Sequence, residues 1–154
     1  LGFGCSVRGA KKEEVSLPVF EIQQELEERL QKSGRVLLRA PTGSGKSTGV
    51  PVMLLEGGLA DGLIVVVQPR RIAARLLAGF VARSLGVKLG EEVGYAVRFD
   101  TRYGDRTRIV YVTDGVLQRW LRVLEHILRR PTAITTINQF HRDRTGCFLV
   151  LGTH

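Results

Sequence analysis

The segment from residue 35 to residue 48 constrains the fold more than any other part of the chain. An apolar run leads into a glycine-rich loop that ends in Gly-Lys-Ser, and a helical pattern begins at residue 46. The loop reads Ala40, Pro41, Thr42, Gly43, Ser44, Gly45, Lys46, Ser47 and Thr48. A strand, a glycine-rich loop and a helix in this order are typical of the phosphate-binding loop (P-loop) of nucleoside triphosphatases.

The residue types in this P-loop suit phosphate chemistry. Gly43 and Gly45 let the backbone wrap closely, so that successive N–H groups can point at phosphate oxygens. The helix that starts at Lys46 adds unpaired N–H groups and the positive end of its dipole. The Lys46 ammonium can reach the β- and γ-phosphates, and the Ser47 hydroxyl can ligate Mg²⁺. We therefore expect residues 42–48 to bind the phosphates of a nucleoside triphosphate, with Lys46 as the catalytic residue and Ser47 as the Mg²⁺ ligand.

Composition limits the class of protein further. The 154 residues fit one domain, and a hydrophobic content of 44% can supply a core. The formal charge of +8 suggests an anionic partner, either nucleic acid or a membrane surface. Cys5 and Cys147 have no metal or redox spacing, so a reducing cytoplasm is the expected location. We find no apolar stretch long enough to span a bilayer and no secretory signal, and so expect no membrane partner.

Hydrophobic patterns predict the order of elements. Residues 1–16 are expected to form a loose arm. Helices are expected at residues 19–32, 46–56, 71–85 and 115–129, and strands at residues 35–40, 63–68, 93–99 and 108–113. The run at 63–68 is apolar throughout, which is typical of a strand covered on both faces. The alternation predicts an α/β domain with a mainly parallel sheet flanked by helices, in which ligands bind beyond the carboxyl ends of the strands.

Three later segments follow predicted strands and carry polar groups suited to nucleic acid. The residues are Arg70 and Arg71, then Arg98 and Phe99, then Thr113, Asp114 and Gly115. Arginine forks suit phosphate, an arginine beside an aromatic ring can stack on a base, and free N–H groups at a helix start can meet a phosphate backbone. Taken singly, each segment also fits a plainer interpretation: a charged turn, an edge strand with a core phenylalanine, and a helix cap.

Taken together and in order, these segments resemble the DEAH-box helicases of superfamily 2, and among them the bacterial HrpB type. The similarity runs from about residue 17 to residue 121. The resemblance implies the first of two RecA-like helicase domains, with ATP held around Lys46. It also implies that single-stranded nucleic acid is contacted around Arg70, Arg98 and Thr113.

One family motif departs from the pattern. The family carries Asp-Glu-x-His, in which Asp holds Mg²⁺ and Glu activates the attacking water, and this chain has no such motif. At about the expected distance stand Asn138, Gln139 and His141. As a degenerate copy, these amides would lack a proton-accepting group, and losing a positioned base typically costs ~10²–10⁴-fold in rate. Alternatively, residues 122–154 are unrelated sequence.

Three functions therefore stay open at the level of sequence. The first is the ATP-binding portion of a DEAH-type helicase, which also needs a second RecA-like domain. The second is a module that binds nucleotide and nucleic acid without hydrolysis. The third is a small-molecule phosphotransferase, which would need an arginine lid and an acceptor pocket. At this level the single-stranded partner is either RNA or DNA, and the direction of unwinding and the oligomeric state stay open.

Overall fold

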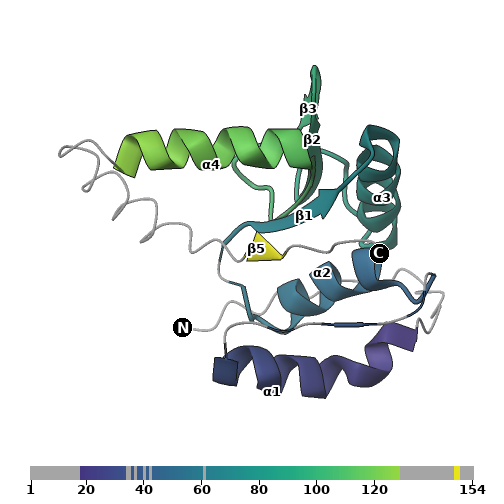
Figure 1. Ribbon diagram of the computed structural model, residues 1–154. Coiled ribbons are helices and arrows are strands. Elements are labelled where there is room, and N and C mark those ends of the chain that lie inside the picture. The colour runs from purple at the N-terminus through teal and green to yellow at the C-terminus, as the bar shows by residue number, and fades with distance from the viewer. Residues whose placement is uncertain are drawn as a thin grey trace, which may run out of the picture.

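The computed structural model describes residues 18–33, 36, 38–39, 41, 43–60, 62–128 and 148–149. These residues form a sheet with helices on both faces (Figure 1). The helices are η1 (Pro18–Ile22, a 3-10 helix), α1 (Gln23–Ser33), α2 (Lys46–Glu56), α3 (Arg71–Ser84) and α4 (Asp114–Leu128). The strands are β1 (Ile64–Gln68), β2 (Val93–Val97), β3 (Asp100–Arg102), β4 (Ile109–Thr113) and β5 (Phe148–Leu149). The predicted α/β class is confirmed.

The described strands are ordered β3-β2-β4-β1-β5. All neighbours run parallel except β2 and β3, which form an antiparallel hairpin. Strands β1 and β2 are buried along their whole length, as is β4 apart from half-buried Thr113. Both faces of the parallel strands are covered, which explains the continuous apolar run at residues 64–67 of β1 and the burial of β2 and β4.

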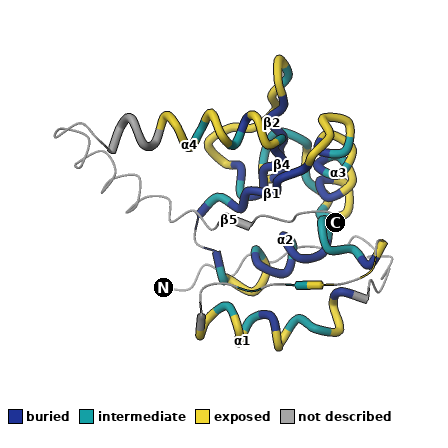
Figure 2. The backbone as a smooth tube through the Cα atoms, viewed as in Figure 1, coloured by how far each residue is buried: buried dark blue, intermediate teal, exposed yellow. Residues whose placement is uncertain are grey.

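Two apolar clusters fill the space on either side of the sheet. The larger cluster packs α2 and α3, with α1 beyond α2, against one face and includes Met53, Ala78 and Tyr111. The smaller one packs α4 against the other face through Val110, Val112 and Val116. Figure 2 shows the buried strands between helices whose outer faces are exposed. The molecule is therefore a layered α/β/α domain, as predicted.

Most predicted element boundaries agree with the structure. Helix α2 has the expected bounds, and Pro51 lies inside it, buried, rather than ending it. The predicted first strand lies largely outside the described residues, and Val36, Leu38 and Arg39 do not form a strand. The predicted loose arm also lies outside the described residues. In the predicted tail, α4 continues to Leu128 and β5 pairs with β1, so the expected boundary at residue 121 falls within a helix.

Two face assignments that follow from the sequence periodicity are wrong. Alternation predicts Phe99 on one side with Val93, Tyr95 and Val97, and helical spacing predicts Phe20 on an apolar stripe with Ile22, Leu26 and Leu30. Phe99 does not continue the buried side of β2, because the strand ends at Val97 and the chain turns at Arg98 and Phe99 into β3. Phe99 is 89% exposed. In the first predicted helix, the buried side chain of the first turn is Val19, whereas Phe20 is partly exposed, because that turn is a 3-10 helix with a different angular spacing.

Among the described helices, none combines the length and the apolar character that crossing a membrane requires.

Candidate functional site

The described part of the P-loop has the backbone that its glycines predict. Gly43 and Gly45 have φ values of +84° and +87°, a conformation that side chains other than glycine rarely adopt. The Ser44 N–H donates to the Pro41 carbonyl (3.3 Å), and the Gly49 N–H donates to the Gly45 carbonyl (2.6 Å). The loop thus turns tightly into the first turn of α2. Thr42, which was predicted to bind nucleotide, lies outside the described residues.

The ammonium of Lys46 is held at the mouth of this loop. Its Nζ donates to the carbonyl of Pro41 (2.7 Å) and to Oγ of Ser44 (3.3 Å). The Thr48 hydroxyl donates back to the Gly45 carbonyl (3.2 Å), and Ser44 is buried. The loop therefore gathers a cation, a positive helix end and glycine N–H groups in one place, which is the set of donors that an anion requires.

The start of α2 is tied to the middle of the sheet by a tyrosine. The Tyr111 hydroxyl on β4 donates to the Ser47 carbonyl at 2.8 Å. Tyr111 is fully buried, and burial raises the pKa of its hydroxyl well above the usual range, so the group stays protonated and acts as a donor. Sequence reasoning missed this residue, because the contact joins positions 64 apart in the chain.

The other predicted contact residues follow strands that end together. Gln68 at the end of β1 is paired with Thr113 at the end of β4. Ala96, one residue before the end of β2, is paired with Val112. Since these three strands are parallel neighbours, the segments that follow them lie along one edge of the sheet, as predicted for its carboxyl edge. Tyr111, two residues before Thr113, brings the start of α2 to the same part of the molecule.

Two exposed arginines lie where β1 gives way to α3. Arg70 precedes the first turn with extended backbone (φ −119°, ψ 132°), and Arg71 is the first residue of α3. Both are exposed. The side chain of Arg70, the N-cap residue of α3, makes no capping hydrogen bond, so it leaves the N–H groups of the first turn available to an anion.

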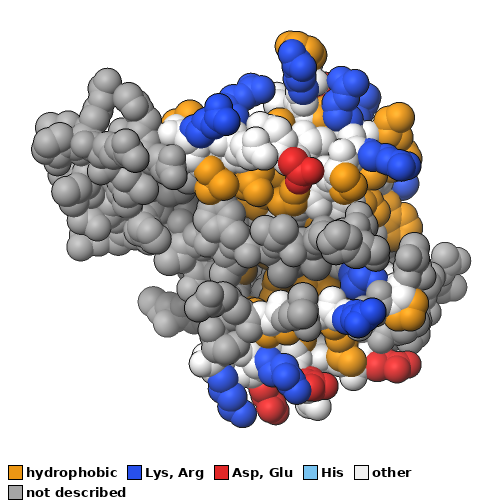
Figure 3. Space-filling model, viewed as in Figure 1, with side chains coloured by type: hydrophobic (Ala, Val, Ile, Leu, Met, Phe, Trp, Pro, Cys, Tyr) orange, Lys and Arg blue, Asp and Glu red, His pale blue; other side chains and the backbone are white. Residues whose placement is uncertain are grey.

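The Arg98–Phe99 pair forms the tip of the β2–β3 hairpin. The Arg98 guanidinium carbon lies 4.7 Å from the centre of the Phe99 ring. At the base of the hairpin, Asp100 accepts a hydrogen bond from the Tyr95 hydroxyl (3.0 Å) and forms an ion pair with Arg75 of α3 (3.3 Å). These contacts hold the base of the hairpin against α3, so that its tip presents a basic and an aromatic side chain in a fixed position. Figure 3 shows Lys and Arg side chains, with hydrophobic ones between them, on this part of the surface.

Thr113, Asp114 and Gly115 lie at the junction of β4 and α4. Asp114 is the first residue of α4 and is exposed, as is Gly115. A side chain added at Gly115 would meet nothing within 4 Å, so this surface is open. Beside them lies Gln68, which is 3% exposed and whose Nε2 has no hydrogen-bond partner among the described residues. A buried amide N–H₂ group without a hydrogen-bond partner requires an explanation. Because Gln68 lies beside Thr113, we regard it as a further candidate ligand-binding residue.

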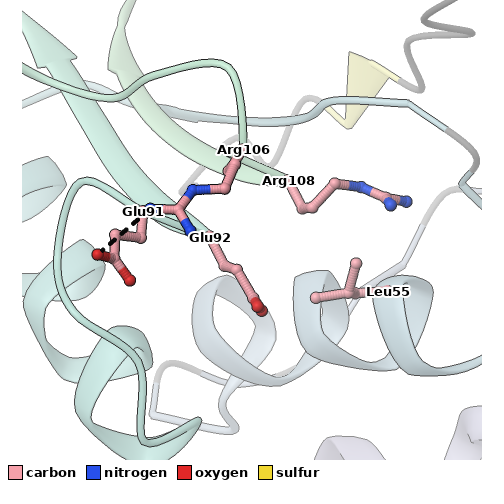
Figure 4. A pocket seen from close by; sticks show the side chains of 5 residues that line it. All are labelled: Leu55, Glu91, Glu92, Arg106 and Arg108. Atoms are coloured by element: carbon pink, nitrogen blue, oxygen red, sulfur yellow. Dashed lines mark ion pairs between the residues drawn. The ribbon is translucent and has the colours of Figure 1, made fainter. Parts of the chain in front are cut away.

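The remaining polar cluster lies at the opposite ends of these strands. A pocket of about 430 Å³ is lined by Leu55, Glu91, Glu92, Arg106 and Arg108 (Figure 4). Arg106 forms an ion pair with Glu91 at 3.5 Å, and Arg108 donates to the Ala60 carbonyl at 2.9 Å. The two glutamates of this pocket precede β2, its two arginines precede β4, and its leucine belongs to α2, so the pocket is separate from the carboxyl edge. Asn138, Gln139 and His141, the degenerate motif, lie outside the described residues. Within the described ranges, no three His, Cys, Asp or Glu side chains gather as metal ligands.

Comparisons with known proteins agree on one group of relatives. No protein-family model matches the chain. Probable ATP-dependent RNA helicase DHR2 of Saccharomyces cerevisiae is 41% identical over 141 residues, which is 89% of this chain and 19% of the relative. The human ATP-dependent RNA helicase DHX33 is 45% identical over 120 residues, or 77% of this chain and 17% of the relative.

A solved structure shows the same fold. The crystal structure of the Escherichia coli DEAH/RHA helicase HrpB superimposes with a TM-score of 0.70 at 32% identity, over 90% of this chain and 20% of that one. The chain thus spans about a fifth of the length of the relatives that it matches.

Proposed function

We propose that this chain is the first RecA-like, ATP-binding portion of a DEAH-type helicase. The relatives are named as ATP-dependent RNA helicases, and the matching solved structure is a DEAH/RHA helicase. The proposal assigns Mg-ATP to the P-loop and single-stranded nucleic acid to the carboxyl edge of the sheet. The observation that carries the proposal is the pairing of Gln68 at the end of β1 with Thr113 at the end of β4. This pairing supports one continuous surface for nucleic acid, formed by segments that are distant in the sequence.

At the P-loop, the proposed roles follow from the donors. Lys46 would neutralise charge on the β- and γ-phosphates, and the Ser47 hydroxyl would hold Mg²⁺. The N–H groups from Gly43 to Thr48 would contact the phosphate oxygens, a role that the positive φ angles of Gly43 and Gly45 support. Held by the Ser47 hydroxyl, Mg²⁺ would supply positive charge that offsets the negative charge of the phosphates.

At the sheet edge, the proposed roles divide between phosphate and base. Arg70 and Arg71 would contact phosphates of a single strand, together with the N–H groups at the start of α3 and α4. The exposed Phe99 ring, with Arg98 over it, would stack on a base. We expect RNA, because the relatives are named as RNA helicases, and a cytoplasmic location.

A second candidate is favoured by the two amides at Asn138 and Gln139. If these residues replace the acidic pair of the family, the chain would bind both ligands and not hydrolyse ATP. ATP turnover with and without single-stranded RNA separates the two. Stimulated turnover supports the helicase portion, and binding of both ligands without turnover supports the module. Turnover stimulated only by a small acceptor would contradict both.

Nucleotide binding is tested by calorimetry with Mg-ADP and Mg-ATP. Lys46→Ala should weaken affinity about tenfold or more, because a charge-assisted contact to phosphate is worth about 1.5–3 kcal/mol. Lys88→Ala, which removes an exposed lysine away from the P-loop, should bind like the native chain. Equal affinity of native chain and Lys46→Ala would show that the P-loop assignment is wrong.

Strand binding is tested by the salt dependence of affinity for a short single-stranded RNA. Arg70→Ala should flatten the slope of log K against log salt by about 0.7, the value for one lost phosphate contact with a single strand. Arg83→Ala removes an exposed arginine at the opposite end of α3 and should leave the slope unchanged. If both variants behave alike, the carboxyl edge is not the binding surface.

A further inference from the structure

A proline in α2 removes a hydrogen bond at the residue proposed to hold Mg²⁺. In an α-helix the N–H of residue i donates to the carbonyl of residue i−4, so the Ser47 carbonyl would pair with the N–H of residue 51. Residue 51 is Pro51, which has no N–H. The Ser47 carbonyl therefore lacks its regular helical donor, and a partly buried acceptor without a donor lowers stability unless another group replaces that donor.

Tyr111 supplies the missing donor from another layer of the molecule. Its hydroxyl meets the Ser47 carbonyl at 2.8 Å. The ring lies in the middle of β4, where Tyr111 is paired with Val66 on one side and Tyr95 on the other. A side chain packed on both flanks has little freedom, so the position of the hydroxyl follows the position of β4.

The two ends of this contact belong to the two proposed sites. Ser47 stands at the P-loop, and Thr113 and Asp114 stand two and three residues after Tyr111. Thr113 is only half buried and Asp114 is exposed, so a ligand can reach this end of β4 although the rest of the strand is inaccessible. A ligand that fixes or shifts this end of β4 therefore also acts on Tyr111, whose hydroxyl is hydrogen-bonded to the Ser47 carbonyl.

We propose that Tyr111 is a positioning residue that couples the two sites, by holding the backbone of Ser47 to the strand that carries the nucleic-acid contacts. The proposal rests on the proposed function, because it needs both ligands. Binding of a nucleic-acid strand at Thr113 and Asp114 would fix the accessible end of β4 and, through the Tyr111 hydroxyl, the backbone of Ser47, so that less ordering is left for Mg-nucleotide to impose. Coupling is reciprocal, so each ligand would raise the affinity of the other by the same factor.

Two substitutions separate this coupling role from a structural one. Tyr111→Phe keeps the packed ring and removes the hydroxyl, which leaves the Ser47 carbonyl without this donor. Pro51→Ala introduces a backbone N–H at the position from which a helix donates to Ser47. In the double variant the carbonyl is paired again, but by α2 itself and not by β4. A purely structural role predicts full recovery, whereas the coupling role predicts recovery of stability alone.

The experiment measures the affinity for Mg-ADP with and without saturating single-stranded RNA, and the melting temperature of each variant. We expect the native chain to bind Mg-ADP about fivefold or more tightly with RNA, the lower end of typical coupling. In Tyr111→Phe, RNA should no longer raise the affinity for Mg-ADP, so the ratio of the affinities with and without RNA should fall to about one, and the melting temperature should be lower. The double variant should melt close to the native chain, but its affinity ratio should also be about one. Tyr103→Phe, which removes an exposed hydroxyl, should keep both.

The outcomes distinguish this proposal from the one on which it rests. A ratio that survives in Tyr111→Phe, or that returns in the double variant, overturns the coupling role and leaves the proposed function intact. A native chain that binds both ligands independently does the same. A native chain that binds neither ligand overturns both proposals.

Discussion

Phe99 is the residue whose backbone most plainly departs from what its side chain prefers. Among the described residues it is the only one other than glycine with a positive φ, at +67°. The left-handed region costs a bulky side chain roughly 1–2 kcal/mol, and Phe99 recovers little of this by burial, since it is 89% exposed. A strained, exposed aromatic side chain at a hairpin tip is understandable if the ring contacts a ligand.

Phe99→Gly tests this residue by two measurements. Removing the strain and adding backbone freedom have opposite effects, so the free energy of unfolding should stay within about 1 kcal/mol of the native value. Affinity for single-stranded RNA should fall about fivefold or more, because stacking on one base is worth about 1–3 kcal/mol. Phe99→Tyr keeps an aromatic ring and should bind as the native chain does. Unchanged RNA affinity in Phe99→Gly would contradict a stacking role.

Helix α3 shows how an element can present its larger apolar side chains outward. The side chains that face the sheet are Ala74, Ala78, Val81 and Ala82, all buried, whereas Ile72 and Leu76 are 72% and 68% exposed. Alanines let the helix lie close to β2 and β4, where a larger side chain would not fit. The sequence pattern through Ile72, Leu76 and Phe80 predicts the helix but marks its exposed side.

Substitutions on the two sides of α3 should therefore have opposite costs. Ala78→Leu should lower the free energy of unfolding by about 1–3 kcal/mol, because it overfills a packed site. Leu76→Lys should change it by no more than about 0.5 kcal/mol, as expected for an exposed helical position. Urea unfolding of both variants provides the measurement. A large cost for Leu76→Lys would mean that this side of α3 is covered in the folded chain.

At the scale of the whole molecule, the P-loop helix and the sheet form one unit. The larger apolar cluster joins α1, α2 and α3 to the sheet, and Tyr111 lies within it. Burial disfavours the ionised form of the Tyr111 hydroxyl in the folded chain, and separation of these layers removes that effect. Ionisation of Tyr111 is therefore linked to unfolding of the domain.

This linkage predicts a loss of stability at high pH. Burial raises the pKa of Tyr111 in the folded chain, whereas in the unfolded chain it stays near ~10. Between these two values the unfolded chain binds fewer protons, so the free energy of unfolding falls by up to ~1.4 kcal/mol per pH unit, and below pH ~10 this contribution is fully present. Urea unfolding at a series of pH values should show a steeper loss in the native chain than in Tyr111→Phe. Parallel curves would contradict the prediction; Tyr103→Phe should follow the native curve.

The sequence by itself determined most of the helices and strands and the tight backbone of the loop before α2. Continuous valine and isoleucine runs, helical periodicity and the spacing of Gly43 and Gly45 are local properties, set by backbone geometry within a few residues. They sufficed to predict β1, α2 and the α/β class. The motif order also indicated the group of relatives that the comparisons then found.

The tertiary structure alone decided which side of each element is buried and which distant residues meet. Three features depend on the packing of one helix or strand against another. They are the exposed side of α3, the turn at Phe99 and the hydrogen bond from Tyr111 to Ser47. A periodic pattern of apolar residues predicts that a helix or strand has an apolar face. It carries no information on which other helix or strand will pack against that face. The proposed binding edge depends on the pairing of β1 with β4, which places Gln68 opposite Thr113, and the packing of the whole sheet sets this register.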